Sequence, residues 1–218
     1  MKFDFIIVGS GLAGMNAALN ASNYGKVLLL SKKKITQSNT YYAQGGIAVA
    51  LDPQDNFSSH LQDTLTAGSF HNHKNHTRFM VKNGPAAINK LVSMGMKFST
   101  NSGQIALTRE GGHSHRRVAF YKDHTGKRVV QTLKQNVLQK KSIKVVENAL
   151  ATDLIIKDSV CLGINVIIDG NYTSFFSKLV VLATGGLGML FSKTTNPSVS
   201  TGDGLAMAIK AQAKYQDL

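Results

Sequence analysis

The first residues that could do chemistry form a glycine-rich motif at the start of the chain. Gly9-Ser10-Gly11-Leu12-Ala13-Gly14 fits the pattern G-x-G-x-x-G and follows the apolar run Phe3–Val8. Gly9 would permit a tight turn, Gly11 would let a pyrophosphate approach the backbone, and Gly14 would let a helix pack closely on the preceding strand. The phosphates would then face free N–H groups at the helix N-terminus. The motif predicts a dinucleotide-binding turn, and an ordinary glycine turn is the alternative.

The elements that must position this motif are alternating buried strands and helices. Phe3–Val8 and Val27–Leu30 are continuous apolar runs, typical of buried parallel strands, and Leu12–Tyr24 carries apolar residues at helical spacing between them. Helical patterns follow at 58–67, 74–94 and 129–140, and strand patterns at 143–146 and 179–183. Gly84-Pro85 should break or restart the second of these helices. The alternation predicts an α/β fold with a doubly wound, Rossmann-like parallel sheet.

A different pattern occupies Ala149–Ser177. Three β-rich runs lie there, separated by turn residues, at Asp153–Lys157, Gly163–Ile168 and Tyr172–Phe176. Short strands joined by tight turns predict a small antiparallel β-meander within the domain. A last helix is expected to start near Gly204 and to run to the C-terminus. Residues 1–218 are thus predicted to form one domain.

Composition excludes several classes of protein. With 43% hydrophobic residues and 3 prolines among 218 residues, the chain should fold around a core. The 25 Lys and Arg against 12 Asp and Glu give a net charge of +13, but the basic runs lack interleaved aromatic residues, so no nucleic-acid partner is expected. The apolar runs are too short and too interrupted for a membrane span or a signal peptide. The chain has 1 cysteine, which excludes an intramolecular disulfide and fits a reducing compartment. We therefore expect a cytoplasmic protein without a metal site.

One expected residue is missing from the dinucleotide pattern. An acid about twenty residues after the motif usually binds the ribose hydroxyl. Here no Asp or Glu occurs between Asp4 and Asp52, and the second strand ends in Leu30-Ser31-Lys32. Two interpretations stay open on these residues. The cofactor is either a nicotinamide dinucleotide whose 2′-phosphate is read by Lys32–Lys34, or a flavin held in another way.

A resemblance decides between them. In order along the chain, the matching blocks are Gly9–Gly14, Leu30–Lys32, Asn39-Thr40-Tyr41-Tyr42-Ala43-Gln44-Gly45-Gly46-Ile47-Ala48, Ala183–Gly186, Thr195–Pro197 and Gly202–Gly204. This arrangement resembles the flavoprotein family of L-aspartate oxidases and the flavoprotein subunits of succinate dehydrogenase and fumarate reductase. The cofactor that it implies is FAD. The family's chains are longer, so the capping domain and the C-terminal helical domain, with the arginine that serves as acid and base, are expected to lie outside residues 1–218.

The resemblance also assigns the cofactor-binding residues. Ser10–Ala13 would line the diphosphate, Lys32 would lie near the adenosine end, and Asn39–Gly46 would wrap the ribityl chain and flavin ring. Asp203 would lie near the ribityl or phosphate region, although an N-cap before a helix is an alternative role. Members that attach FAD covalently carry His where this chain has Asn39, five residues before Gln44. The resemblance therefore implies non-covalent FAD.

A second segment bears on the substrate. The loop Leu107-Thr108-Arg109-Glu110-Gly111-Gly112-His113-Ser114-His115-Arg116-Arg117 resembles the aspartate oxidase sequence rather than the succinate or fumarate one. Aspartate carries an amine that succinate lacks, and Glu110 would supply an anionic acceptor for it, while arginine and histidine offset the dicarboxylate charge. Two alternatives stay open. Glu110 could pair with Arg116 or Arg117 on the surface, and His113 and His115 could be substrate anchors or structural imidazoles.

The function that the resemblance implies is FAD-dependent oxidation of L-aspartate to iminoaspartate, with oxygen or fumarate as the acceptor. This would be the first step of quinolinate and NAD synthesis, with a possible hand-over of iminoaspartate to quinolinate synthase. Two alternatives are a catalytically inactive FAD-binding fragment and a succinate or fumarate oxidoreductase flavoprotein.

Overall fold

The computed structural model describes residues 2–216 and divides into two compact units. The first unit comprises Met1–Tyr42 and Leu133–Leu218, and the second comprises Ala43–Thr132. The helix α5 (Thr125–Gln139) crosses the boundary between them. No helix within residues 2–216 is long and apolar enough to cross a membrane.

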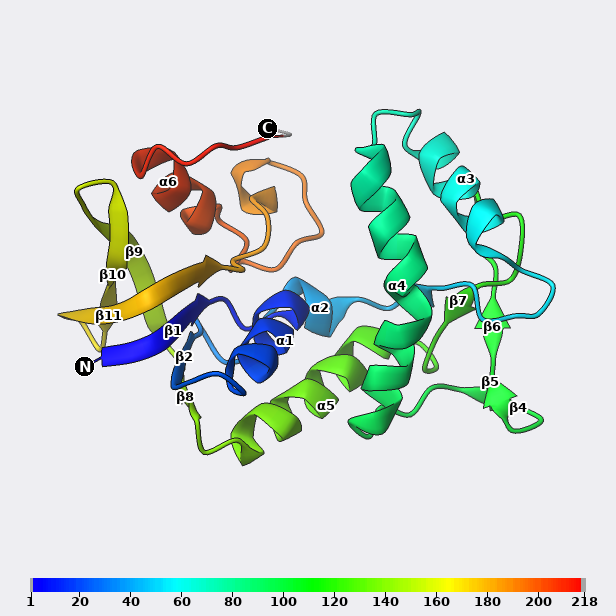
Figure 1. Cartoon of the computed structure of the whole chain (residues 1–218), viewed down its shortest axis with the longest axis horizontal. Coiled ribbons are helices and arrows are strands. Elements are labelled where there is room, and N and C mark those ends of the chain that lie inside the picture. Colours follow the sequence, from blue (N-terminus) through cyan, green and yellow to red (C-terminus); the bar gives the residue numbers. More distant parts are fainter. Residues whose placement is uncertain (1, 217–218) are drawn as a thin grey trace. The chain divides into compact units, whose positions relative to one another are not determined.

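The first unit is built on a mixed sheet, seen at the left of Figure 1. Within the described residues this sheet has six strands, in the order β8-β2-β1-β11-β10-β9. Their bounds are β1 (Lys2–Val8), β2 (Val27–Leu30), β8 (Ile143–Val146), β9 (Ala149–Lys157), β10 (Val160–Ile168) and β11 (Asn171–Leu182). β8, β2, β1 and β11 run parallel to one another, whereas β9 and β10 are antiparallel neighbours. The predicted α/β class with a Rossmann-like parallel sheet is confirmed.

The helices of the first unit cover both faces of this sheet. They are α1 (Leu12–Ala21), α2 (Asn39–Tyr42), the 3₁₀ turn η1 (Gly188–Leu190) and α6 (Asp203–Lys210). Ile6 and Leu28 belong to the buried cluster that includes Met207 of α6. Because side chains alternate along a strand, Ile7 points to the opposite face, where α1 packs with its buried Met15.

The predicted meander is part of the main sheet rather than a separate one. β9, β10 and β11 are antiparallel as expected, but β11 continues without interruption through Leu182 and pairs in parallel with β1, with Val8 opposite Leu182. The sequence pattern had separated 172–176 from 179–183, because Ser177 and Lys178 interrupt the apolar run. Ser177 is in fact buried and its hydroxyl donates to the carbonyl of Leu179.

The turn between β1 and α1 is held by contacts that leave no room for side chains. A Cβ at Gly9, where φ is +109°, would lie 2.2 Å from the carbonyl oxygen of Ala183, just beyond β11. A Cβ at Gly14 would lie 1.8 Å from the carbonyl oxygen of Gly9. Gly11 is different, since its nearest neighbour would be Thr40 Oγ1 at 3.4 Å. Gly9 and Gly14 therefore serve packing, whereas Gly11 faces free space.

The second unit contains α3 (Phe57–Ala67) packed on α4 (Lys74–Ser93), with two small sheets. One sheet pairs β3 (Ile47–Ala48), β7 (Val118–Ala119) and β6 (Leu107–Thr108), and the other pairs β4 (Thr100–Asn101) with β5 (Gln104–Ile105). Asn56 caps α3 by accepting a hydrogen bond from the N–H of Ser59 at 2.9 Å.

Two predictions about helices were wrong. Pro85 does not break the helix over 74–94, because α4 runs unbroken through it. Its buried residues Thr77, Val81 and Ile88 share one face, and this packing outweighs the lost backbone hydrogen bond. The last helix does not run to the C-terminus either, since α6 ends at Lys210.

The packing of the first turn leads to a stability prediction. Gly14→Ala should lower the free energy of unfolding by at least about 1–3 kcal/mol, because the added methyl group forces β1 and α1 apart. Gly11→Ala is the matched control and should leave stability nearly unchanged. Urea unfolding of both variants measures the difference. Equal stabilities would contradict the packing role of Gly14.

Candidate functional site

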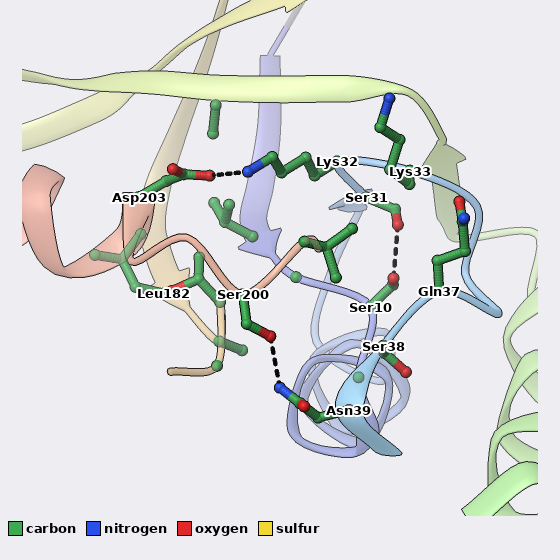
Figure 2. A pocket seen from close by; sticks show the side chains of 18 of the residues that line it. Ser10, Ser31, Lys32, Lys33, Gln37, Ser38, Asn39, Leu182, Ser200 and Asp203 are labelled. Carbon is green, nitrogen blue, oxygen red and sulfur yellow. Dashed lines mark hydrogen bonds and ion pairs between the residues drawn. The ribbon is translucent and has the colours of Figure 1, made fainter. Parts of the chain in front are cut away.

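A cavity of about 320 Å³ opens in the first unit where the parallel strands end. Its wall includes Val8 at the end of β1, Ser31 after β2 and Leu182 at the end of β11 (Figure 2). In doubly wound sheets, ligands bind at the carboxyl ends of the strands, because the loops that follow the strands diverge there. The cavity is therefore where the fold would accept a cofactor.

The start of α1 forms one side of this cavity. Gly11 is the N-cap and makes no side-chain capping hydrogen bond, and no acid lies in the first turn of the helix. The N–H of Leu12 donates to Thr40 Oγ1 at 3.2 Å. A helix start with a glycine N-cap and no acid leaves room and positive potential for a phosphate group. These residues fit the diphosphate of a dinucleotide.

Polar cross-links tie together the segments around the cavity (Figure 2). Lys32 Nζ lies 2.7 Å from Asp203 Oδ2 and 2.5 Å from Thr201 Oγ1. Asn39 Nδ2 donates to Ser200 Oγ at 2.8 Å, and the hydroxyls of Ser10 and Ser31 are 2.6 Å apart. The segment before α6 is thereby fastened to the loop after β2 and to the start of α2.

The predicted cofactor-binding residues divide into those that line the cavity and those that do not. Gly9, Ser10, Gly11, Leu12, Ala13, Lys32, Asn39, Thr40 and Asp203 line it. Gly14 instead packs against Gly9, and Tyr41 and Tyr42 lie outside the lining, with their rings in an edge contact 5.4 Å apart. Ala43, Gln44, Gly45 and Gly46 belong to the second unit.

Glu110 lies in an exposed loop of the second unit that connects β6 to β7. A Cβ added at Gly45 would lie 3.6 Å from Glu110 Oε1, so this carboxylate is beside the backbone of the predicted flavin-wrapping segment. Within residues 2–216 no ion pair joins Glu110 to Arg116 or Arg117. The alternative that Glu110 is neutralised by a neighbouring arginine finds no support.

Arginine and histidine side chains line a second hollow, of about 610 Å³, in the same unit. Its lining comprises Asp52, Gln54, Thr108, Arg109, Ser114, His115 and Arg116. Two guanidinium groups against one carboxylate leave this hollow positively charged. Such a surface suits a ligand with more than one carboxylate.

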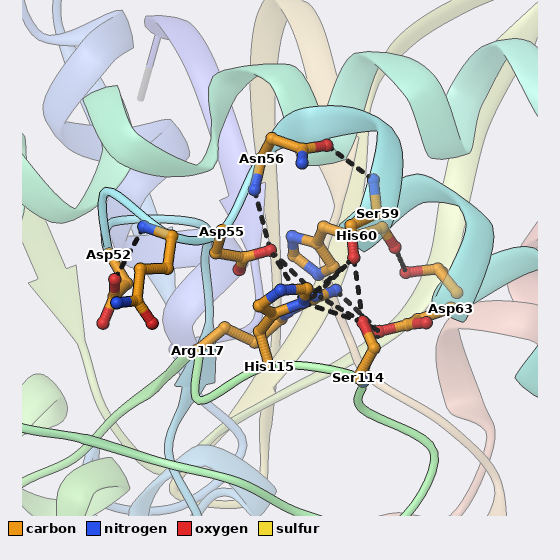
Figure 3. A network of polar contacts seen from close by, with 11 residues as sticks. Asp52, Asp55, Asn56, Ser59, His60, Asp63, Ser114, His115 and Arg117 are labelled. Carbon is orange, nitrogen blue, oxygen red and sulfur yellow. Dashed lines mark hydrogen bonds and ion pairs between the residues drawn. The ribbon is translucent and has the colours of Figure 1, made fainter.

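Arg117 has a different role from the other arginines of the loop. Its side chain is fully buried, with Nη2 at 2.9 Å from Asp55 Oδ1 and Nη1 at 3.1 Å from Asp63 Oδ2 (Figure 3). Nη2 also donates to Ser59 Oγ at 3.2 Å. A buried guanidinium with two acidic partners is a structural centre of this unit, since loss of one partner leaves an uncompensated buried charge.

The histidines of the loop differ in their surroundings. His115 Nδ1 lies 3.0 Å from Ser114 Oγ and 3.2 Å from Ser59 Oγ, within the polar network around Arg117. His113 is half-buried, and its Nδ1 has no hydrogen-bond partner within the described residues. These surroundings favour a structural imidazole at His115, and they leave the buried Nδ1 of His113 without a partner among the described residues.

Sequence reasoning missed the residues that hold this network. Asp55, Ser59 and Asp63 lie on α3 or just before it, more than fifty residues from Arg117 along the chain. Acids ahead of a helix were consistent with simple capping, and no periodicity links them to a distant arginine. Only the position of Arg117 directly before the apolar run Val118–Phe120 could have suggested burial.

His60 of α3 provides a prediction about pH. Burial lowers its pKa below the ordinary 6.5, and the charges of Arg117 and His113 act in the same direction. The unfolded chain binds this proton first, so stability is full above about pH 6.5 and falls as the pH drops below it. His60→Gln should flatten the decline between pH 7 and 5, which is at most about 1.4 kcal/mol per pH unit. The exposed His71→Gln variant should not, and identical profiles for both would contradict this burial effect.

Comparisons with known proteins agree with this geometry. The family model "FAD binding domain" matches residues 4–218. L-aspartate oxidase 2-b of Nicotiana tabacum is 40% identical over 99% of this chain and 34% of its own length, and L-aspartate oxidase of Clostridium perfringens is 39% identical over 99% and 49%. The chain thus spans between a third and a half of these relatives.

Solved structures show the same fold. A variant of E. coli quinol fumarate reductase FrdA superposes with a TM-score of 0.93 at 30% identity, covering 96% of this chain and 37% of that one. Sdh1 of Mycobacterium smegmatis gives a TM-score of 0.92 at 28% identity, over 97% and 38%. Since the family model covers nearly the whole sequence, the chain belongs to the FAD binding domain family, and its cofactor is FAD.

Proposed function

We propose that this chain binds FAD non-covalently and takes part in the oxidation of L-aspartate to iminoaspartate. The observation that carries the proposal is the position of the Glu110 carboxylate beside Gly45, in the segment predicted to wrap the flavin ring. The relatives named L-aspartate oxidase support the same substrate. The product would enter quinolinate and NAD synthesis, with a hand-over to quinolinate synthase as a further prediction.

Each group in the proposed site has a separate task. FAD, when bound, would supply the acceptor for the hydride from C2 of the substrate, the substrate amine would release a proton to solvent, and oxygen or fumarate would take up the electrons. The Glu110 carboxylate accepts hydrogen bonds from the substrate amine and orients C2. Arg109 and Arg116, with the half-buried His113 as a further anchor, balance the two substrate carboxylates. His115 shares the polar network that shapes this surface.

A succinate or fumarate oxidoreductase is the second candidate, favoured by the likeness to the fumarate reductase structure. Such substrates have no amine, so an unpaired Glu110 carboxylate would repel their negative charge. This argues for the amino acid. A catalytically inactive FAD-binding fragment is the remaining alternative, and it would hold the cofactor in the cavity of the first unit without turning over either substrate.

The mode of FAD attachment can be checked directly. Asn39 donates its amide N–H to Ser200 and offers no imidazole nitrogen for a bond to the flavin. Acid precipitation of the FAD-loaded protein should therefore release all of the yellow cofactor into the supernatant. Flavin absorbance that stays with the protein pellet would show a covalent bond and contradict the proposal.

The substrate is tested by Glu110→Gln. Under anaerobic conditions, L-aspartate should bleach the flavin bands of the FAD-loaded protein, and succinate should do so more slowly. The variant should lose about 10–100-fold in kcat/KM for L-aspartate and little for succinate, because a charged hydrogen bond to the amine is weakened.

The Gln variant keeps the shape of the side chain, so the comparison isolates its charge. Unchanged selectivity for L-aspartate over succinate would overturn the assignment of Glu110. An oxidised spectrum that L-aspartate does not alter, with FAD bound, would favour the inactive fragment.

A further inference from the structure

The tip of the loop that carries Glu110 has almost nothing to hold it. Cβ atoms added at Gly111 and Gly112 would meet no atom of the described residues within 4 Å. Among the described residues, one backbone hydrogen bond lies within the tip, from the N–H of His113 to the carbonyl of Glu110 at 3.2 Å. Gly112 adopts φ +85°, a conformation that favours glycine, and a glycine can also adopt many other backbone conformations. The position of Glu110 must therefore be fixed from outside the tip.

The fixed point is Ser114, four residues after Glu110. Its N–H and its hydroxyl both donate to Asp63 Oδ2, each at 2.7 Å. The Ser114 hydroxyl also lies 2.8 Å from Ser59 Oγ. A carboxylate that accepts two hydrogen bonds from one residue fixes both its backbone and its side chain. The loop is thus attached to α3 at this residue.

A rigid base supports this attachment. The N–H of Arg117 donates to the carbonyl of Thr108 at 3.0 Å and closes the loop, while the carbonyl of Arg117 accepts from the N–H of Val49 at 2.7 Å. The guanidinium of Arg117 forms an ion pair with the same oxygen, Asp63 Oδ2, at 3.1 Å (Figure 3). Asp63 is therefore held in place by its helix and by a buried cation, and through its hydrogen bonds with Ser114 it can hold the loop in place.

The electrostatics of Asp63 agree with this role. Burial raises the pKa of its carboxyl, but the two hydrogen bonds from Ser114 and the charges of Arg117 and His113 outweigh burial and hold the pKa below its usual range. The group is ionised near neutral pH and accepts strong hydrogen bonds. Its side chain keeps 17% of its exposure, whereas Arg117 and Asp55 are fully buried.

We propose that Asp63 is a positioning residue for Glu110: through Ser114 it sets where the loop presents the carboxylate that meets the substrate amine. This inference deepens the proposed function and rests on it for the role of Glu110. Arg117 and Asp55 are the structural base, and their removal would unfold the unit. Ser114 can be altered with that base in place, whereas altering Asp63 also removes one of the two acidic partners of Arg117.

The first test is amide hydrogen exchange on the chain itself, with three variants. Asp63→Ala removes both hydrogen bonds, Ser114→Ala removes only those of the hydroxyl, and Ser114→Thr retains a hydroxyl. Exchange at residues 110–114 should quicken about tenfold or more in Asp63→Ala and less in Ser114→Ala, with the Thr variant close to the parent protein.

The matched control is Asp153→Ala. Asp153 also forms an ion pair, with Lys210, but it lies in β9 of the first unit. This variant should leave exchange at 110–114 unchanged. If Asp63→Ala does not fold, the contrast between Ser114→Ala and Ser114→Thr still decides. Loop exchange that is unaltered in every folded variant would overturn the proposal.

The second test separates positioning from general stability. In the FAD-loaded protein, Asp63→Ala should raise KM for L-aspartate about tenfold and KM for succinate by clearly less, because succinate shares the carboxylate anchors of the loop but has no amine for Glu110 to meet. Equal losses for both substrates would indicate a merely structural role and contradict the proposal.

The two proposals can fail independently of each other. If Glu110→Gln leaves substrate selectivity unchanged, the proposed function fails, whatever exchange shows at the loop. If Glu110→Gln abolishes selectivity while Asp63→Ala alters neither loop exchange nor KM, only the positioning role of Asp63 fails.

Discussion

The close approach of three backbone segments around Gly9 is the constraint on which the first unit depends. β1 lies between β2 and β11, and the backbone after it must turn sharply against Ala183 before α1 begins. Carbonyl oxygens occupy the space where side chains at Gly9 and Gly14 would be. The same approach brings the start of α1 to the carboxyl edge of the sheet, where a helix N-terminus can meet phosphate. Packing and cofactor binding thus follow from one turn.

The second unit solves a different physical problem, which is how to hold a flexible polar loop in place. A buried guanidinium between two carboxylates is costly to desolvate, and such groups persist where they specify one arrangement. Here Arg117 closes the base of the loop and pairs with Asp63, and Asp63 in turn holds Ser114 by hydrogen bonds. The two glycines of the tip, Gly111 and Gly112, are free of packing and Glu110 is exposed, so its carboxylate can face a ligand. The Arg117 network at the base thus stabilises the loop, and Glu110 at the tip is the group that we propose meets the substrate.

Much of this arrangement follows from the sequence. Continuous apolar runs located β1 and β2, and the spacing of glycines located the turn, because both depend on neighbours close in the chain. The continuation of β11 and the unbroken α4 could not be inferred, since packing on distant segments outweighs Ser177 and Pro85. The same holds for the Arg117 network, whose acids come from a helix far away in sequence. Glu110 was found only through resemblance, and its place beside Gly45 needed the structure.

Hydrogen exchange of the chain with and without FAD locates the cofactor without relying on turnover. We expect FAD to bind in the cavity of the first unit and to slow exchange at residues 9–13 and 199–203, which lie at that cavity. Protection of other segments while these two stay unchanged would contradict it, as would the absence of any FAD-dependent protection at saturating cofactor.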